Sequence, residues 1–274
     1  MNWIEILLLG LMSGLSEFIP ISSGGHQRLL LHLFGKTQMD PLCRLMLSFG
    51  TLLAVVTACS NLIQCLMAER ALARRKRKSG AYGSRHYDYR IVKTALWPLA
   101  IVYTVFSLLR ISISLPVLAL VFTVNGIILF VTGNMRQGNK DSKRMSALDS
   151  TFMGFFGGAS AIAGISLTGM VSSVAVARGA QPKLALNWAF MIAIPALLLR
   201  MAIDLLFVII GGTALSFTGF LWCIAGAFFA FIGGRISIRL IKFVVGRSDL
   251  SGLSGFSYYV WGAAILTFIL FLIT

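Results

Sequence analysis

The chain has 274 residues, of which 57% are hydrophobic and 12% are charged, and its mean hydropathy is +0.86. A soluble domain does not need so many apolar side chains, whereas several segments that each span a bilayer do. A net charge of +15 would suit nucleic-acid binding, but most of the Lys and Arg residues fall in short connections between apolar runs. The composition predicts an integral membrane protein with a single membrane domain over residues 1–274, and no nucleic acid as partner.

Eight apolar stretches of 19 to 32 residues divide the chain. In chain order they cover residues 3–34, 41–67, 91–109, 114–132, 151–177, 184–210, 215–234 and 255–274. Six of them predict transmembrane helices. The stretches 3–34 and 151–177 are broken in the middle by Gly, Ser or Pro, so we expect each to form a re-entrant helical hairpin. Such a break is tolerable where protein or a water-filled cavity covers its backbone.

Three basic connections set the expected topology. They hold nine, four and four of the 24 Lys and Arg residues and cover residues 69–93, 134–149 and 235–249. Such loops normally lie in the cytoplasm and contact anionic membrane lipids. Counting spans from these loops places the N- and C-termini outside. It also opens the first hairpin from the outside and the second from the cytoplasm.

The two broken stretches carry nearly the same sequence. The first reads GLMSGLSEFIPISSGGH from Gly10, and the second reads GFFGGASAIAGISLTGM from Gly154. One hairpin and three spans per half make an odd number of crossings, so the halves have opposite orientations. The sequence therefore predicts an all-α membrane protein of two inverted repeats, residues 1–133 and 148–274. In such proteins the broken helices meet at a site near the membrane centre.

The first broken stretch holds a polar cluster at its tip. Pro20 should interrupt the helix, and Ser22 and Ser23 then precede a helix whose free N–H groups would favour an anion. Glu17 and His26 are ionisable groups at membrane depth, which makes them functional candidates. The alternative for each serine alone is a helix cap, and for Glu17 a set of hydrogen bonds from backbone N–H groups.

This tip resembles the signature of the undecaprenyl-pyrophosphate phosphatase family, the bacitracin-resistance phosphatases, which typically reads EGLTEFLPVSSTGH. The similarity continues through residues 32–35, 49–56, the tip of the second broken stretch (residues 163–171) and 190–195. The resemblance implies hydrolysis of undecaprenyl pyrophosphate to undecaprenyl phosphate and phosphate on the outer face of a bacterial cell membrane. That reaction recycles the lipid carrier of peptidoglycan synthesis and confers antibiotic resistance.

The chain departs from the family pattern at several positions. The first Glu of the family motif is Ser13 here, and the family's second motif, PGxSRSxxT, has Leu167 in place of its Arg and Thr168 in place of its second Ser. A guanidinium group is the natural partner of a pyrophosphate, so its loss bears directly on catalysis. Arg28 and Arg200 could replace it. We expect Arg28 to reach the outer headgroups and Arg200 to pair with Asp204 four residues along the same helix.

The residues and the resemblance together support an enzyme. Ser23 would be the nucleophile or bind phosphate, His26 would be its acid or base, and Glu17 would hold a divalent cation (Mg or Ca) or transfer a proton. The expected substrate-binding residues are Ser22, Gly24, Gly25, Ser166, Thr168, Gly169 and Arg28.

A different class of function remains open. A catalytically impaired homologue could bind a polyprenyl-phosphate lipid or move it across the membrane, because inverted repeats with broken helices are also the architecture of transporters. A third alternative is a binder that sequesters the lipid. A homodimer is also left open.

Overall fold

The structure is a computed structural model that describes residues 1–79, 87–109, 113–136, 138–212, 215–248 and 251–273. Within these ranges the chain is helical apart from its connections and one isolated β-bridge between Lys140 and Ala180. The helices are α1 (Trp3–Phe18), α2 (Ser23–Leu33), α3 (Pro41–Ala58), α4 (Ser60–Ser79), α5 (Tyr87–Leu108), α6 (Leu115–Gly133), α7 (Ala147–Gly158), the short 3-10 helix η1 (Ala159–Ala161), α8 (Leu167–Ala177), α9 (Pro182–Gly211), α10 (Phe217–Ser248) and α11 (Ser251–Ile273).

Six of these helices are long and apolar enough to cross a membrane, namely α3, α5, α6, α9, α10 and α11. The six spans predicted from the sequence are therefore confirmed as helices. The two broken stretches each form a pair of shorter helices, α1 with α2 and α7 with α8.

Two of the predicted boundaries are wrong. The stretch 41–67 is not one helix, because Cys59 leaves the helical conformation between α3 and α4. Helix α10 does not end at residue 234 but continues to Ser248. The continuation buries Ile238, Ile241 and Val245 on one face, while Arg and Lys side chains can extend away from it.

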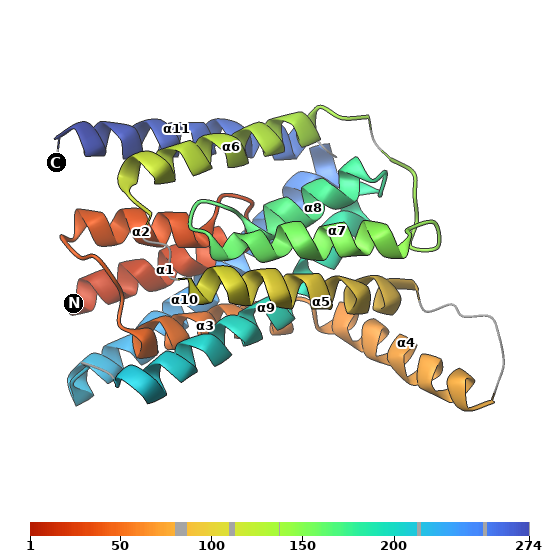
Figure 1. Cartoon of the computed structure of the whole chain (residues 1–274), viewed down its shortest axis with the longest axis horizontal. Helices are drawn as coiled ribbons and strands as arrows, with labels where there is room; N and C mark the ends of the chain where they lie inside the picture. Colours follow the sequence, from red (N-terminus) through yellow and green to blue (C-terminus); the bar gives the residue numbers. More distant parts are fainter. Residues whose placement is uncertain (80–86, 110–112, 137, 213–214, 249–250, 274) are drawn as a thin grey trace.

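The ends of the chain and its basic connections lie on opposite sides of the molecule. Both termini lie at the left of Figure 1, whereas the connection from α6 to α7 and the far end of α4 lie at the right. Helices α6 and α11 run side by side along one edge, and the four shorter helices α1, α2, α7 and α8 occupy the middle. This placement puts the breaks of both helix pairs inside the bundle.

Duplicated glycines explain how the two halves fit together. Gly10 and Gly14 lie where α1 crosses α10, and a Cβ on either would overlap a backbone carbonyl of α10. Gly154 and Gly158, 144 positions later, lie where α7 crosses α5, and a Cβ there would meet the carbonyls of Ala95 and Leu99. Small residues four apart let two helix backbones approach closely. Each half thus packs its first helix against a long helix of the other half.

The starts of α1 and α7 are also duplicated. Asn2 and Glu5 form a capping box on α1, with the Asn2 side chain accepting from the Glu5 amide and the Glu5 carboxylate accepting from the Asn2 amide. Ser146 and Asp149 form the same box on α7. Burial raises the pKa of Asp149, but hydrogen bonds from Ser146 and the Arg178 guanidinium outweigh it and leave the pKa below its ordinary value. The sequence repeat thus includes the signal that begins each broken segment.

Candidate functional site

The two tips contact each other, as the sequence predicts for its repeated segments. The Ser22 hydroxyl accepts hydrogen bonds from the amide of Gly25, at 3.2 Å, and from the amide of Gly164 in the second tip, at 3.0 Å. Ser22 has a φ of 73° and is the only non-glycine residue with positive φ in the described ranges. Such a backbone costs about 1–3 kcal/mol and persists only where its surroundings hold it. Ser22 is therefore a cap that joins the tips, and its hydroxyl uses both acceptor positions in doing so.

A buried asparagine of α6, Asn125, bonds to both tips and was not predicted from the sequence. The Asn125 side chain donates to the carbonyl of Pro20 at 3.2 Å and accepts from the amide of Ser166 at 3.4 Å. Asn125 is 2% exposed and lies within an apolar span. A polar side chain at that depth is the signal that could have identified it.

The second tip is a capped helix start. The Ser166 hydroxyl accepts from the Gly169 amide at 3.2 Å and lies 3.3 Å from the Thr168 hydroxyl, which donates to the Glu17 carbonyl at 3.4 Å. Only Ser166 of these three expected binding residues lines the cavity described next. Thr168 bonds to the first tip and Gly169 to Ser166 within the second tip, and substrate binding by either stays a prediction.

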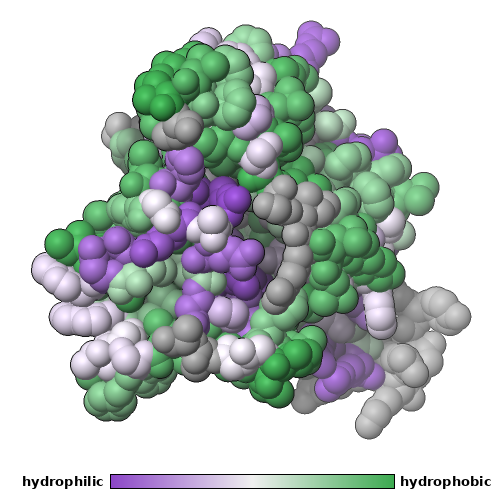
Figure 2. All heavy atoms as spheres, turned by 60° about the vertical axis from the view of Figure 1, so that its left-hand side comes forward, coloured by the Kyte–Doolittle hydropathy of each residue, from purple (hydrophilic) through white to green (hydrophobic). Residues whose placement is uncertain are grey.

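A cavity of about 330 Å³ lies beside the tips, and residues from α1, α2, α3, α5, α9 and the second tip line it. Figure 2 shows hydrophilic side chains gathered around a hollow in the face that carries the termini, with apolar surface around them. Five of the lining residues carry charge, namely Glu17, Arg28, Arg44, Arg200 and Asp204. An excess of arginines over carboxylates favours an anionic ligand.

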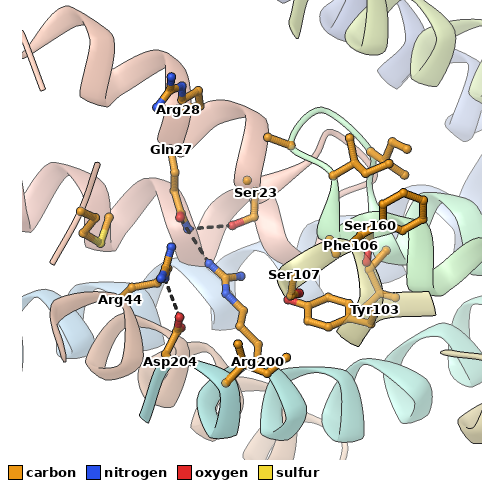
Figure 3. A pocket seen from close by; sticks show the side chains of 18 of the residues that line it. Ser23, Gln27, Arg28, Arg44, Tyr103, Phe106, Ser107, Ser160, Arg200 and Asp204 are labelled. Carbon is orange, nitrogen blue, oxygen red and sulfur yellow. Dashed lines mark hydrogen bonds and ion pairs between the residues drawn. The ribbon is translucent and has the colours of Figure 1, made fainter. Parts of the chain in front are cut away.

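Arg200 lies at the centre of a hydrogen-bond network in this cavity (Figure 3). Its guanidinium donates to the Glu17 carboxylate at 3.4 Å and to the Gln27 side-chain oxygen at 3.3 Å. The Gln27 amide in turn donates to the hydroxyls of Ser13, at 2.7 Å, and Ser23, at 3.1 Å. The network thus joins Glu17 to Ser23, two residues predicted from the sequence. The link runs through Arg200 and Gln27, which were not predicted to lie there.

The predicted pair between Arg200 and Asp204 is wrong. The Asp204 carboxylate instead accepts from Arg44 of α3, at 2.7 Å. Arg200 and Asp204 lie about one turn apart on α9. Arg200 pairs with Glu17 of α1, and Asp204 pairs with Arg44 of α3. A partner on a packed neighbouring helix outcompetes one on the same helix surface, whose pairing contributes only about 0.2–0.5 kcal/mol.

His26 and Ser23 point in different directions. The His26 ring lies 2.8 Å from the Ser22 carbonyl through Nδ1 and 3.0 Å from the Tyr259 hydroxyl through Nε2, and it stacks on the Tyr259 ring. It does not line the cavity, whereas Ser23 does. Among the described contacts no hydrogen bond joins His26 to Ser23, so the expected base is not positioned on that hydroxyl in this arrangement. The catalytic role of His26 stays a prediction.

Of the remaining predicted residues, two line the cavity and one packs against a neighbouring helix. Gly24 and Arg28 line the cavity, and the Arg28 guanidinium donates to the carbonyl of Thr37. Gly25 does not line it. A Cβ on Gly25 would lie 2.5 Å from the Phe122 ring, so packing by itself requires a glycine here, and substrate binding by Gly25 stays a prediction.

A metal site built from the protein alone is not present in the part of the chain that the structure describes. No group of three or more His, Cys, Asp and Glu side chains that could hold a metal ion occurs there. Glu17 is the predicted ligand, and its carboxylate accepts from Arg200.

Six apolar helices of bilayer length around a polar cavity define this chain as a multi-pass membrane protein. The family model described as bacitracin resistance protein BacA matches residues 6–266. The chain belongs to the BacA family, as the resemblance of its first tip indicates.

Three relatives are similar to it over nearly their whole length, and each is named undecaprenyl-diphosphatase. The protein of Carboxydothermus hydrogenoformans is 27% identical over 270 residues, covering 97% of both chains. That of Alkaliphilus metalliredigens is 30% identical over 281 residues, 98% of this chain and 99% of the relative. That of Syntrophotalea carbinolica is 29% identical over 268 residues, which cover 95% of this chain and 96% of the relative.

Proposed function

We propose that this chain hydrolyses undecaprenyl pyrophosphate to undecaprenyl phosphate and phosphate. The observation that carries the proposal is the cavity, which brings Glu17, Ser23 and Arg200 together beside the motif that resembles the family signature. Relatives named undecaprenyl-diphosphatase that match over nearly the whole chain support it.

The residues of the cavity suit attack on a phosphoanhydride. The Ser23 hydroxyl, oriented by Gln27, would attack the terminal phosphorus, forming a new O–P bond while the bond to the bridging oxygen breaks. Undecaprenyl phosphate leaves with that bridging oxygen, and water then releases phosphate from the serine. In the alternative role, Ser23 binds a phosphate oxygen and water attacks directly. Glu17 is the nearby carboxylate that would accept the proton in either case.

A divalent cation, Mg or Ca, would bind together with the substrate. Such ions in phosphate sites often take only one or two carboxylates from the protein, with phosphate oxygens and water as the other ligands. In the alternative to its role as proton acceptor, Glu17 would be that single carboxylate, and the ion would neutralise charge on the diphosphate.

The orientation that we propose has two inverted repeats, residues 1–133 and 148–274, with α1–α2 and α7–α8 as re-entrant hairpins. The packing of α1 on α10 and of α7 on α5 supports it. In each case the first helix of one repeat packs on a long helix of the other repeat. The hollow lies on the face that carries the termini, opposite the basic connections. The basic connections would then face the cytoplasm and its anionic lipids, the cavity and both termini would face outward, and a homodimer remains a prediction.

Phosphate release from undecaprenyl pyrophosphate by the purified protein, with and without Mg²⁺ or Ca²⁺, tests the proposal. We expect Ser23→Ala to reduce release at least about 100-fold, because it removes the nucleophile or a phosphate contact. The conservative change Ser216→Ala, at the start of α10 and outside the cavity, is the matched control. Release that is unaffected by Ser23→Ala would overturn the assigned site. Retained headgroup binding without any release would favour a binding or translocating homologue.

A further inference from the structure

The position that lacks the family's arginine lies on the same cavity as an arginine from another helix. Leu167 occupies the place of the motif Arg, and it lines the cavity together with Arg200 of α9. The two residues come from different helices that pack against each other, α8 and α9. A guanidinium is therefore present at the site even though the motif has lost its own.

Arg200 is held loosely enough to accept a ligand. Its bonds to Glu17 and Gln27 measure 3.4 and 3.3 Å, longer than the about 2.7–2.9 Å usual for hydrogen bonds from charged groups, and its side chain is 17% exposed. A guanidinium has five N–H donors, so at least three are free of these two bonds. A charge within a 30-residue apolar helix is costly and suggests a function for that residue.

The other two arginines of the cavity are bonded outside the network of Glu17, Gln27 and Ser23. Arg44 donates to the Asp204 carboxylate at 2.7 Å, and Arg28 donates to the carbonyl of Thr37 near the mouth. A diphosphate placed beside Ser23 would also meet the negative charge of Glu17. Arg200 bonds to Gln27, which bonds to the Ser23 hydroxyl, so of the three arginines it is the one linked to that serine and best placed to bind the diphosphate.

We propose that Arg200 binds the diphosphate in place of the arginine that the second motif lacks, and that it exchanges Glu17 for phosphate oxygens when substrate enters. The exchange frees the Glu17 carboxylate to accept a proton at the moment when substrate is present. This inference rests on the proposed function, since it assigns a residue to the same site.

Three variants test the assignment. Arg200→Gln removes the charge and should lower kcat/KM for undecaprenyl pyrophosphate about 100-fold or more, the usual effect of losing a group that stabilises transition-state charge. Arg200→Lys keeps the charge but loses the planar guanidinium, which can bind two phosphate oxygens at once, so we expect an intermediate loss of kcat/KM. Arg235→Gln is the matched control, because Arg235 lies on the apolar helix α10 and bonds to Thr57 outside the cavity, and its kcat/KM should stay within about threefold of wild type.

A relocated arginine separates a ligand role from a structural one. The double variant Leu167→Arg/Arg200→Leu returns the guanidinium to the motif position, and we expect it to recover at least about tenfold of the activity that Arg200→Leu loses. Thermal unfolding in detergent reports whether each variant folds. Arg200→Gln that folds and keeps kcat/KM within about threefold of wild type would overturn the inference.

Binding of inorganic pyrophosphate, measured by calorimetry on the purified protein, makes the test independent of turnover. We expect Arg200→Gln to weaken it at least about tenfold and Arg235→Gln to leave it unchanged. If the wild-type protein binds pyrophosphate but releases no phosphate from the lipid, the proposed hydrolysis fails while the assignment of Arg200 stands. Equal binding by wild type and Arg200→Gln would reject the assignment alone.

Discussion

Replacing Gly10 with alanine tests how closely α1 and α10 approach. The new Cβ would lie 2.9 Å from the carbonyl carbon of Gly226 and closer still to its oxygen, whereas carbon atoms normally pack at about 3.5–4.0 Å. Both atoms belong to the backbone, so the helices must separate. Overpacking of this kind costs about 1–3 kcal/mol, and the better helix propensity of alanine returns only about 0.5–1 kcal/mol. Because both contacting atoms are backbone, the upper part of that cost, about 2–3 kcal/mol, applies, and with about 1 kcal/mol returned we expect a net loss of about 1–2 kcal/mol.

Thermal unfolding in detergent measures the effect. At about 2–4 °C per kcal/mol, Gly10→Ala should lower Tm by about 2–8 °C. Gly262→Ala, in the apolar helix α11, is the control, because nothing lies within 4 Å of the Cβ that it adds. Its Tm should be unchanged or slightly higher. A Tm of Gly10→Ala equal to that of Gly262→Ala would refute the close crossing of α1 and α10.

Three further substitutions probe the polar contacts. The pKa of Asp149 is lowered in the folded chain, so its contribution is full above its ordinary value of about 3.9 and is lost as the pH falls through the folded value. Asp149→Asn should thus lower Tm at pH 7 and much less near pH 3; an equal loss at both would contradict this. Asp204→Asn leaves Arg44 without its anion and should cost about 1–3 kcal/mol in chemical unfolding, and no cost would argue against that pair. Tyr259→Phe removes one partner of His26 and should cost about 1 kcal/mol while phosphate release persists, and loss of release in a folded variant would show a direct role of that contact.

The sequence predicted the spans better than the partners inside them. Long apolar runs between basic connections define six helices almost regardless of tertiary context, because the bilayer requires their length and composition. The end of α10 was missed, since the basic residues after 234 suggest a loop unless one sees that Ile238 and Ile241 recur on a buried face. Mean hydropathy over a segment does not show that its apolar residues share one face of a helix.

The candidate site was predicted by residue type and not by geometry. The polar cluster with Glu17 and Ser23 stands out in an apolar stretch, and the cavity contains both. The partner of Arg200 could not be deduced, because Glu17 lies 183 positions away and the two meet only where α1 and α9 line the same cavity. The orientation of His26 likewise depends on Tyr259 of α11, a contact that no local spacing predicts.

The crossed glycine contacts constrain the order in which the chain can be assembled. Helix α1 is synthesised first, but the surface that accepts Gly10 and Gly14 belongs to α10 and is not made until more than 200 residues later. Until then the face of α1 that carries Gly10 and Gly14 has no helix to pack against. Its docking is therefore a late event that depends on contacts distant in sequence, which are the slow ones in folding. A nascent chain truncated before residue 217 should leave α1 accessible to labelling reagents, and extension through α10 should protect it.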